Sequence, residues 1–481
     1  MRIEIEHCFM KSLEEIFAPG NTPEQIISAL SGQKKDCPSW DVISKDFDTR
    51  KHDIVADPML RPKEKIKGGR KERPAKLTYA AEQIATRRMT QMAFSIPVKR
   101  VYSQAANDVE KAFQDAIEAV YKNVRIDGVN MNRMYAYFAA CEMMTFWYIA
   151  EGDEVVNKYG FDSNVKIRCR SFSPMPRRFS KIAQASIYPY FNEDDDLVAL
   201  SVAYVDQENV SHFNSYTAKN AYFFRQEAGG WTSEVRPNIA GKIPAVYIQR
   251  PIPVFDGISS NRDDIEFTLS RNSDNIRKNS SPILKIIGEL AGGDTLPVGD
   301  TARQVYKMKD GGDIGLISPA LTTTDAKAHI QMLKQIDDET TQQADMTMEN
   351  LKSLGAQSGE ARKTLLTEPH LKVGEEKHEI VWFLDREFEV IKALLVTVKP
   401  EWKQYQHTTR CEQLITPFIQ NDTAADITNF SKASGVLVSQ KTAIKRAGLA
   451  VDADAEYEEI MKEKREEAEA QRMEDVFTGA E

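Results

Sequence analysis

The sequence predicts an α+β protein, and three observations support this fold class. Apolar residues recur at helical spacing through several stretches of the first 150 residues. Beyond Val165 the spacing changes to the period of two that is typical of β-strands. From Asn261 onward two long, polar helical segments enclose a short β-rich insert, and further helical segments follow.

The N-terminal part of the chain is expected to be helical. Residues 1 to about 30 have helical character, and a second short helix should start at Thr22-Pro23-Glu24, because proline is favoured in a first helical turn. Further helices are predicted at about Tyr79–Ala93 and Asn107–Asn123.

The longest apolar run is Met134–Ala150, which Glu142 interrupts. It is shorter than the roughly 20 residues that a bilayer span requires, so we predict no membrane segment. The expected structure is a buried helix whose one face carries Tyr137, Cys141, Met144 and Tyr148.

A basic segment lies between these helices. Arg61–Lys76 contains eight basic residues and two acidic ones. Two interpretations stay open: an arm that reaches nucleic acid or an acidic partner, or a solvated loop, which is favoured because charge runs are usually solvated.

Strands are predicted in the region after Val165. The expected strands are Val165–Ser171, Gln184–Tyr190, Leu197–Val205 and Ala221–Gln226, the last turning through Ala228-Gly229-Gly230 into Trp231. The acidic run Asn192–Asp196 lies between two of them. It lacks the spaced oxygen ligands and the glycine of a calcium loop, so a charged hairpin tip is favoured over a cation site.

The central stretch combines two polar helices with a β-rich insert. The first helix, Asn261–Asn279, has a narrow apolar stripe, and so has the second, about Asp325–Ala344. Their stripes consist of Ile265, Leu269 and Ile276 in the first and of Ala326, Ile330 and Leu333 in the second. Such helices cannot be buried in the core of one subunit, so we expect copies packed side by side in a ring.

The insert reads as three short strands with glycine turns. The predicted strands are Ile283–Ile287, Val305–Met308 and Ile314–Ile317. A turn at Gly292-Gly293 follows the first strand, and a hairpin through Asp310-Gly311-Gly312 joins the second to the third. After Gly359 a helix should start, break at Pro369, and resume from about Glu375 to Val398 with a full apolar face.

Three helices are expected in the C-terminal tail. Asp422 should cap a helix over Thr423–Ala433, and Ser439 should cap Gln440–Ala447. A charged helix from about Ala455 to Met473 follows.

Composition limits the possible functions. With 481 residues, 41% of them hydrophobic, the chain can hold about two to four domains. Its net charge of −9 argues against a protein that coats nucleic acid. The five cysteines, Cys8, Cys37, Cys141, Cys169 and Cys411, are scattered, so neither a disulfide framework nor a zinc site is predicted. Acidic residues near the N-terminus are not typical of a signal peptide, and a reducing cytoplasm is expected.

No catalytic motif was found. The sequence has no phosphate-binding loop, nucleophile elbow or dinucleotide-binding glycine pattern, and His378-Glu379 lacks the second histidine of a zinc protease motif. No cofactor, metal or catalytic residue is therefore predicted. The alternative that remains is a metal-dependent nucleic-acid-processing enzyme that uses dispersed carboxylates.

Several motifs carry a resemblance to a known family. Gly315-Leu316-Ile317-Ser318-Pro319 precedes the second polar helix, and Gln357-Ser358-Gly359-Glu360-Ala361 follows it. Together with Gly241-Lys242-Ile243-Pro244-Ala245-Val246-Tyr247 and the order of elements, they resemble the portal proteins, the head-to-tail connectors of tailed double-stranded DNA phages, in the siphovirus-like branch. Where that family often has an asparagine, this chain has Gln249-Arg250-Pro251.

The resemblance implies a portal-type α+β fold. Its parts would be an α+β wing, a two-helix stem, a small β-rich clip, a tunnel loop with a long wing helix, and a helical C-terminal crown. In this chain they would span residues 1–253 (wing), 254–281 (first stem helix), 282–320 (clip), 321–345 (second stem helix), 346–398 (tunnel loop and long wing helix) and 399–481 (crown).

The resemblance also implies where function lies. The tunnel loop would line the DNA channel with Thr347, Glu349, Asn350, Lys352, Gln357 and Ser358. The clip would dock partners through Lys307, Lys309, Asp310 and Asp313. The implied protein is not an enzyme. It is a ring of about twelve subunits at a capsid vertex of the virion, assembled in the bacterial host cytoplasm, and it would contact double-stranded DNA, terminase, the major capsid or scaffolding protein and a head-completion adaptor, but no membrane.

Overall fold

Helices and largely antiparallel sheets make up the computed structural model, which is 46% helical and 24% strand. This agrees with the predicted α+β class. The structure describes residues 11–67, 70–279, 283–287, 313–317, 323–343, 366–418, 432, 439–447 and 456–466. The chain divides into one unit of residues 1–345 and 368–418 and another of residues 346–367 and 419–481. Each unit is described by itself.

Short helices open the described part of the larger unit. They are α1 (Leu13–Ile16), α2 (Pro23–Ser31), α3 (Trp40–Phe47) and α4 (Asp53–Ala56). The predicted start of α2 is confirmed: Pro23 is its first residue, the Gln25 backbone N–H donates to the Thr22 hydroxyl, and the Thr22 N–H donates to the Gln25 side chain. A small hairpin, β1 (Lys65–Lys67) and β2 (Arg70–Glu72), follows.

The helices expected next are present. They are α5 (Ala81–Phe94) and α6 (Asp108–Val124), and Asn107 caps α6 by accepting the Glu110 N–H. Strand β3 (Lys99–Tyr102) lies between them and pairs with β15 (Cys411–Leu414) near the end of this unit. These two pairing partners, about 310 residues apart in the chain, were not predicted.

The helix predicted over Met134–Ala150 is wrong in its second half. Helix α7 (Ile126–Ala140) ends at Cys141, which has φ of 62°, and strand β4 (Glu142–Asn157) begins at the next residue. Thr145 to Ile149 are β-branched or aromatic residues, which favour a strand, and β4 hydrogen-bonds to strands on both sides. Tyr137 therefore belongs to a helix and Met144 and Tyr148 to a strand.

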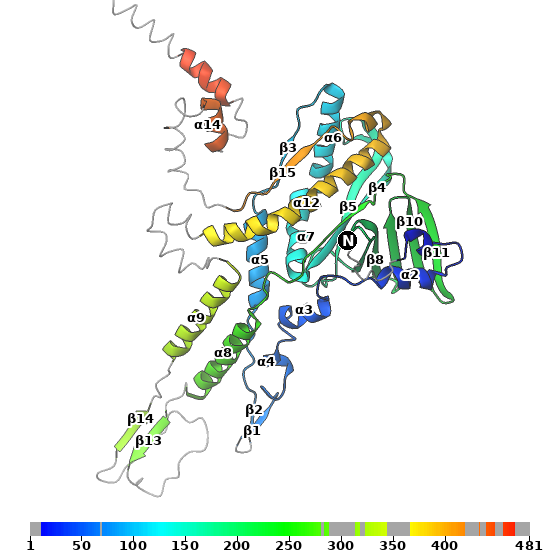
Figure 1. The fold of residues 1–481 in the computed structure, drawn as a ribbon. Helices are drawn as coiled ribbons and strands as arrows, with labels where there is room; N and C mark the ends of the chain where they lie inside the picture. The colour runs from blue at the N-terminus through cyan, green and yellow to red at the C-terminus, as the bar shows by residue number, and fades with distance from the viewer. Residues whose placement is uncertain are drawn as a thin grey trace, which may run out of the picture. The chain divides into compact units, whose positions relative to one another are not determined.

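Two sheets pack face to face in the larger unit (Figure 1), and their strand pairs are antiparallel except for the parallel pair β5 and β6. Within the described residues, one sheet has the strand order β12-β4-β5-β6 and the other β11-β10-β9-β8-β7. The remaining strands of the two sheets are β5 (Asp162–Ser173), β6 (Ala183–Gln184), β7 (Ser186–Phe191), β8 (Leu197–Val205), β9 (Ser211–Thr217), β10 (Asn220–Glu227), β11 (Gly230–Pro237) and β12 (Ala245–Gln249). Leu200, Val202 and Tyr216 from one sheet meet Met144 and Tyr247 from the other in a buried core.

The strand predictions are largely confirmed, and β8 has the predicted bounds. Strand β9 was missed. Its sequence, Ser211–Thr217, is mostly polar, yet Phe213, Ser215 and Tyr216 are buried because it lies between two neighbouring strands. Buried Ser215 is satisfied by a 2.9 Å hydrogen bond from the Ser201 hydroxyl of β8.

Helix α12 (Thr367–Val398) packs on the face of β4 that lies opposite the second sheet. The Arg133 side chain of α7 forms two hydrogen bonds, of 2.5 and 2.8 Å, with the Glu387 carboxylate of α12, and the Trp147 indole of β4 donates to the same carboxylate at 2.9 Å. The break expected at Pro369 is wrong: α12 begins at Thr367, and Pro369 is tolerated because it lies in the first turn. The 3-10 helix η1 (Pro400–Tyr405) follows α12.

The two long polar helices are α8 (Ser259–Asn279) and α9 (Thr323–Thr340). Between them lie β13 (Ile283–Ile287), which has the predicted bounds, and β14 (Asp313–Ile317), which starts one residue before the predicted strand. The two pair in antiparallel register, a pairing that was not predicted, since the expected hairpin joined Ile314–Ile317 to Val305–Met308. The expected strand Val305–Met308 and the turns at Gly292-Gly293 and 310–312 lie outside the described residues.

The smaller unit contains helical segments. Helix α14 (Gln440–Ala447) has the predicted bounds, and the Thr442 N–H donates to the Ser439 hydroxyl, as expected for a cap. Residues 456–466 are helical, within the range expected for the charged helix. Lys464 donates to the Gln440 side chain at 3.1 Å. The helix expected over Thr423–Ala433 and its cap Asp422 lie outside the described residues, apart from residue 432.

Candidate functional site

Most of the predicted site residues lie outside the described part of the chain. These are Thr347, Glu349, Asn350, Lys352, Gln357, Ser358, Lys307, Lys309 and Asp310. Asp313 is described: it is exposed, begins β14 and faces Ile287 across the strand pair. What the structure defines of this region is the pair α8 and α9 and its attachment to the rest of the larger unit.

One face of α8 binds an extended segment by hydrogen bonds. The Tyr79 N–H donates to the Glu266 carboxylate at 2.7 Å, and the Leu77 N–H donates to the Ser270 hydroxyl at 2.9 Å. The Ala75 N–H donates to the Asp274 carboxylate at 2.8 Å. Three side chains of one helix thus take up alternate backbone donors of residues 75–79.

The spacing of the two partners explains this match. Four residues of an α-helix rise about 6 Å, and two residues of an extended chain advance about 6.6 Å. Side chains at every fourth helical position therefore face every second N–H of the segment, which runs antiparallel to α8. We call Arg262, Glu266, Ser270 and Asp274 the polar anchor of α8.

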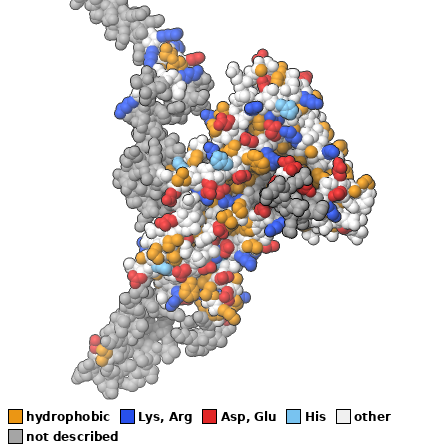
Figure 2. Space-filling view, viewed as in Figure 1, with side chains coloured by type: hydrophobic (Ala, Val, Ile, Leu, Met, Phe, Trp, Pro, Cys, Tyr) orange, Lys and Arg blue, Asp and Glu red, His pale blue; other side chains and the backbone are white. Residues whose placement is uncertain are grey.

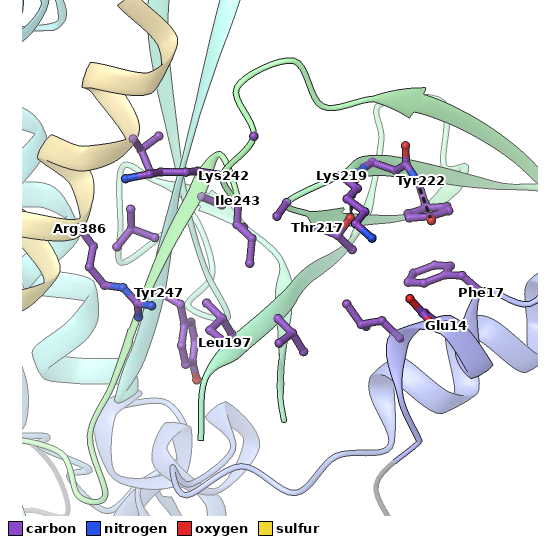
Figure 3. Close-up of a pocket in the computed structure, with 18 of the residues that line it drawn as sticks. Glu14, Phe17, Leu197, Thr217, Lys219, Tyr222, Lys242, Ile243, Tyr247 and Arg386 are labelled. Carbon is purple, nitrogen blue, oxygen red and sulfur yellow. Dashed lines mark hydrogen bonds between the residues drawn. The ribbon is translucent and has the colours of Figure 1, made fainter. Parts of the chain in front are cut away.

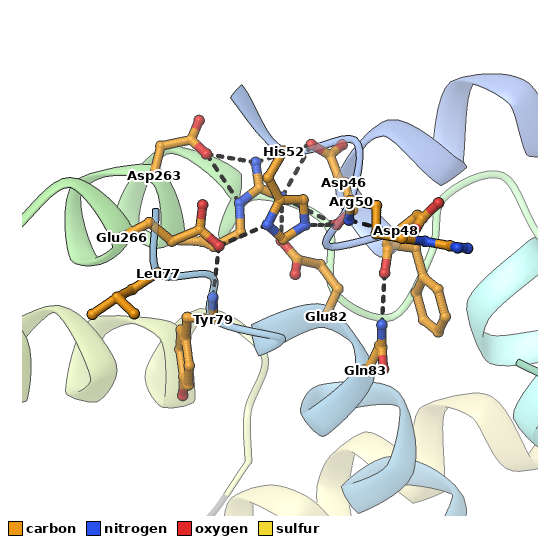
Figure 4. A network of polar contacts seen from close by, with 12 residues as sticks. Asp46, Asp48, Arg50, His52, Leu77, Tyr79, Glu82, Gln83, Asp263 and Glu266 are labelled. Carbon is orange, nitrogen blue, oxygen red and sulfur yellow. Dashed lines mark hydrogen bonds and ion pairs between the residues drawn. The ribbon is translucent and has the colours of Figure 1, made fainter. Parts of the chain in front are cut away.

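Arg262 forms the end of the polar anchor that is closest to the start of α8. Figure 4 labels its partners Asp46, Glu82 and Asp263. Arg262 is 3% exposed, and its guanidinium donates to Glu82 at 2.5 Å, to Asp46 at 3.2 Å and to Asp263 at 2.8 Å. Burial raises the pKa of Glu82 to about 7, and the Arg262 charge acts in the opposite direction. Since Glu82 belongs to α5, this ion pair joins the first turns of α5 and α8.

His52 contacts the polar anchor from the other side. Its Nδ1 lies 2.7 Å from the Glu266 carboxylate and its Nε2 lies 2.6 Å from the Asp46 carbonyl oxygen. A carbonyl only accepts, so Nε2 carries a proton, and a charged Glu266 requires a proton on Nδ1 as well. Burial is the largest influence and lowers the pKa of His52, but the hydrogen bond and the charge of Glu266, together with the bond to the Asp46 carbonyl, raise the pKa overall.

Part of the basic segment is structural. Arg61 is 6% exposed, donates to the Asp274 carboxylate at 2.5 Å and donates to the Ala75 carbonyl at 3.0 Å. It therefore fixes the far end of the polar anchor. Neither interpretation of the basic segment, a binding arm or a solvated loop, describes Arg61, and both stay open for the exposed bases Lys63 and Arg73.

Helix α9 attaches to α8 and α5 through polar side chains. Asn261 donates to Asp337 at 2.9 Å, His329 pairs with Asp264 at 2.8 Å, and Arg88 of α5 pairs with Asp338 at 2.6 Å. The backbone approaches closely where α8 begins. Gly257 has φ of 89°, and a Cβ there would lie 3.3 Å from the Thr340 methyl group.

The other face of α9 is exposed and partly apolar. Leu333, Asp337 and Thr341 are buried, whereas Met332 is 51% and Ile336 is 40% exposed. Ala328, one turn earlier, is exposed as well. Figure 2 shows apolar side chains among the charged ones in the region of α9. We call Ala328, Met332 and Ile336 the outer stripe of α9.

The prediction that α8 cannot be buried within one subunit is wrong for its first three turns. Ile265 is fully buried, and so are the polar residues of the anchor around it, except for Asp274, which is half-buried. The polar face of α8, which was expected to be solvated, is bound to residues 75–79 by hydrogen bonds rather than by apolar contact. A four-residue repeat of charged and hydroxyl side chains was present in the sequence, but the partner segment 75–79 could not be inferred from it.

The acidic run Asn192–Asp196 is a hairpin tip, as favoured from the sequence. The Asn192 side chain accepts the N–H groups of Asp194 at 3.1 Å and Asp196 at 2.8 Å, and Asp195 has φ of 60°. The described part of the chain contains no group of three or more His, Cys, Asp or Glu residues arranged to hold a metal ion. None of its helices is long and apolar enough to cross a membrane.

Comparison with known proteins gave one family. A family model described as "Phage portal protein, SPP1 Gp6-like" matches residues 49–470 of the chain. Comparison with curated proteins found no match. The matched range includes α8, α9 and every residue of the polar anchor.

Removing one acceptor of the polar anchor should destabilise the larger unit. Ser270→Ala leaves the Leu77 N–H without its acceptor in a part-buried contact, and the loss of such a hydrogen bond typically costs about 1 kcal/mol. Ser273→Ala is the matched control, because it makes the same substitution three residues along α8 at a position that is not part of the anchor. We expect urea unfolding to show a loss only for Ser270→Ala. Equal losses in both variants would contradict the role of the hydroxyl.

The His52–Glu266 pair should make stability depend on pH. A histidine whose pKa is raised on folding stabilises the folded state fully below its unfolded pKa of 6.5 and loses this contribution as pH rises through its folded pKa. The free energy of unfolding of the parent should therefore exceed that of His52→Gln most below pH 6.5, and the difference should shrink above it. A difference that is constant from pH 5.5 to 8.5 would show that the imidazolium charge contributes nothing.

Proposed function

The chain belongs to the SPP1 Gp6-like family of phage portal proteins, and from this premise we propose that it forms a ring-shaped channel through which DNA is packaged and later ejected. Portal proteins occupy a capsid vertex of the bacteriophage, act in DNA packaging and connect head to tail; the family is structural rather than enzymatic. The observation that carries the proposal is the pair α8 and α9, anchored by polar contacts to its own unit and apolar on its outer stripe.

The proposed architecture follows the order of the elements. Residues 1–253 would form the wing, α8 and α9 the two stem helices, and residues 282–320 the clip. Residues 346–398 would hold the tunnel loop and the long wing helix α12, and residues 399–481 the crown. The packing of α12 on the sheet of β4 supports the wing part of this division, because Glu387 joins the two through Arg133 and Trp147.

The outer stripe of α9 supports assembly into a ring. Its neighbours on the surface are charged or amide side chains, such as Lys327, Gln335 and Glu339, so the stripe is a narrow apolar line with a polar border. Helices with such stripes gain stability by packing against another helix. We infer that the stripe of one copy packs against the stem of the next, in a ring of about twelve.

The charge of the chain suits a conduit for DNA. A net charge of −9 per subunit gives the ring a repulsive field toward DNA. Affinity for DNA rises steeply with the number of phosphates that Lys and Arg neutralise, so a strand that must keep moving needs few such contacts. Between Met346 and Glu360, Lys352 is the single basic residue, so the ring would place one positive charge per subunit around the channel.

The clip is the proposed docking platform. Lys307, Lys309, Asp310 and Asp313 would bind the terminase motor during packaging and a head-completion adaptor afterwards. The described pair β13 and β14 supports a compact β insert at this point of the chain, with Asp313 exposed on it. The wing would contact the major capsid or scaffolding protein, and the ring would assemble in the host cytoplasm before it becomes part of the virion.

The alternative is a metal-dependent nucleic-acid-processing enzyme. The two functions differ in one readout: the portal should leave DNA intact with Mg²⁺ or Mn²⁺, whereas an enzyme should cleave it and lose this activity when a single Asp or Glu is replaced. The family membership favours the portal.

Ring formation should depend on the outer stripe of α9. Met332→Asp combined with Ile336→Asp places two charges in the proposed interface, so the 54.4 kDa chain should remain a folded monomer. Gln335→Asp, which adds a charge at a neighbouring exposed position, is the control and should give rings. Light scattering after size exclusion and negative-stain imaging distinguish the two results. Rings formed by the double variant would place the interface elsewhere.

Lys352 should affect the packaging or retention of DNA but not the assembly of the ring. Lys352→Glu should give normal rings and procapsids but impaired packaging or retention of DNA, because the proposed phosphate contacts become repulsive. Lys181→Glu, an equal charge change in the exposed loop after β5, serves as the control. The amount of protected DNA per particle is the measurement. If the Lys352 variant packages full-length DNA as the parent does, Lys352 does not face the DNA.

A further inference from the structure

A cavity of about 920 Å³ lies beside β12 in the larger unit (Figure 3). Its walls come from α1, from the starts of β8 and β10, from the loop before β12 and from α12. Phe17, Leu197, Tyr222, Ile243 and Tyr247 give it a largely apolar lining. None of its lining residues belongs to the polar anchor or to the outer stripe, and it has no role in the proposed channel.

The cavity runs along the free edge of β12. Ala245, Val246 and Tyr247 all line it, although successive residues of a strand point to opposite faces of a sheet. Three consecutive residues can line one cavity only if the cavity lies at the strand's edge. Within the described residues, β12 is indeed the outer strand of its sheet.

The hydrogen-bond pattern identifies which backbone groups face the cavity. The Trp147 N–H donates to the Pro244 carbonyl and the Arg250 N–H donates to the Cys141 carbonyl, so even-numbered residues of β12 bond to β4. The N–H and C=O groups of Ala245 and Tyr247 therefore point away from β4, toward the cavity. An extended segment placed there could continue the sheet.

The two faces of β12 differ in chemistry. Ala245 and Tyr247 point toward the five-stranded sheet and its apolar core. The opposite face is covered by α12, whose Arg386 and Glu389 line the cavity together with Lys242. Lys242 pairs with Glu389 at 2.8 Å. Among the described residues Arg386 forms no ion pair. Its guanidinium lies 4.3 Å from the Trp382 ring centroid, and burial lowers the pKa of Arg386.

We propose that this cavity receives an extended segment that pairs with the edge of β12, and that the segment is residues 1–10 of the same chain. A strand added to β12 would turn alternate side chains to the apolar sheet and to the Arg386 side. Ile3 and Ile5 alternate with Glu4 and Glu6 in the required pattern. Leu13 of α1 already lines the cavity, and ten extended residues reach about 33 Å. The placement of residues 1–10 lies outside the described part of the chain.

Hydrogen exchange resolved to single residues tests the pairing in the full chain. With the segment bound, the N–H groups of Ala245 and Tyr247 should be protected as strongly as those of Val246 and Ile248, which bond to β4. Ile3→Asp combined with Ile5→Asp should speed exchange at Ala245 and Tyr247 by about tenfold or more and leave Val246 and Ile248 unchanged. Equal exchange at Ala245 and Tyr247 in parent and variant would overturn the proposal.

A composition-matched variant tests the alternation itself. Glu4→Ile combined with Ile5→Glu keeps the charge and the apolar content but gives two adjacent apolar residues followed by two acidic ones. It should expose the same two N–H groups as the aspartate variant does. Unchanged protection would mean that the alternating pattern is not recognised, and the proposal would fail.

A last measurement separates the chain's own segment from that of a neighbouring copy. In the monomeric variant that carries Met332→Asp and Ile336→Asp, protection of Ala245 and Tyr247 should persist. Protection that is lost on dissociation would assign the segment to the neighbouring copy and overturn the intrachain pairing. The comparison of exchange between the parent and the Ile3→Asp/Ile5→Asp variant needs no ring, so failure of the segment proposal and failure of the portal proposal can be told apart.

Discussion

The buried ion pair between Arg262 and Glu82 is the interaction on which the placement of the two long helices depends. A guanidinium that is 3% exposed must be neutralised and hydrogen-bonded, because an unpaired charge at that depth would be strongly destabilising. Only one position of α8 brings Arg262 to Glu82 and, at the same time, Glu266 to His52. The polar contacts thus select one arrangement where apolar contact alone would permit several.

The same solution recurs where α12 meets the sheet. Glu387 is buried and accepts from Arg133 and Trp147, so one carboxylate fixes a helix to both α7 and β4. Burying polar groups gives little net stability, but any displaced arrangement would leave them without partners. The larger unit therefore combines an apolar sandwich, which supplies most of the stability, with polar contacts that fix its helices.

The sequence predicted an element correctly where residues close together in the chain determine its conformation. The bounds of β8 and α14 and the start of α2 at Thr22-Pro23 follow from residues close together in the chain, and they were predicted correctly. The helix over Met134–Ala150 failed because pairing of β4 with two distant strands decided its conformation. The predicted channel and clip residues are a different case, since they came from resemblance and, except for Asp313, they lie outside the described residues.

The polar anchor was missed for a physical reason. Charged side chains on a helix are normally solvated, and nothing near Glu266 or Asp274 in the sequence indicates that residues 75–79 lie against them. The partner is about 190 residues away. Arg61 shows the same limit, because a basic residue in a basic run is an improbable candidate for burial until its acceptors, Asp274 and the Ala75 carbonyl, are known.

The fourfold spacing of the polar anchor has a mechanical consequence. The three hydrogen bonds to Ala75, Leu77 and Tyr79 lie in a row parallel to the axis of α8, so a pull along that axis loads them together in shear instead of opening them one after another. A slip by one residue would turn the acceptors about 100° away from their donors, and the next position with the same geometry is a full four residues, about 6 Å, along the helix. The attachment should therefore resist small displacements along the helix axis, because no intermediate position within about 6 Å restores the three hydrogen bonds.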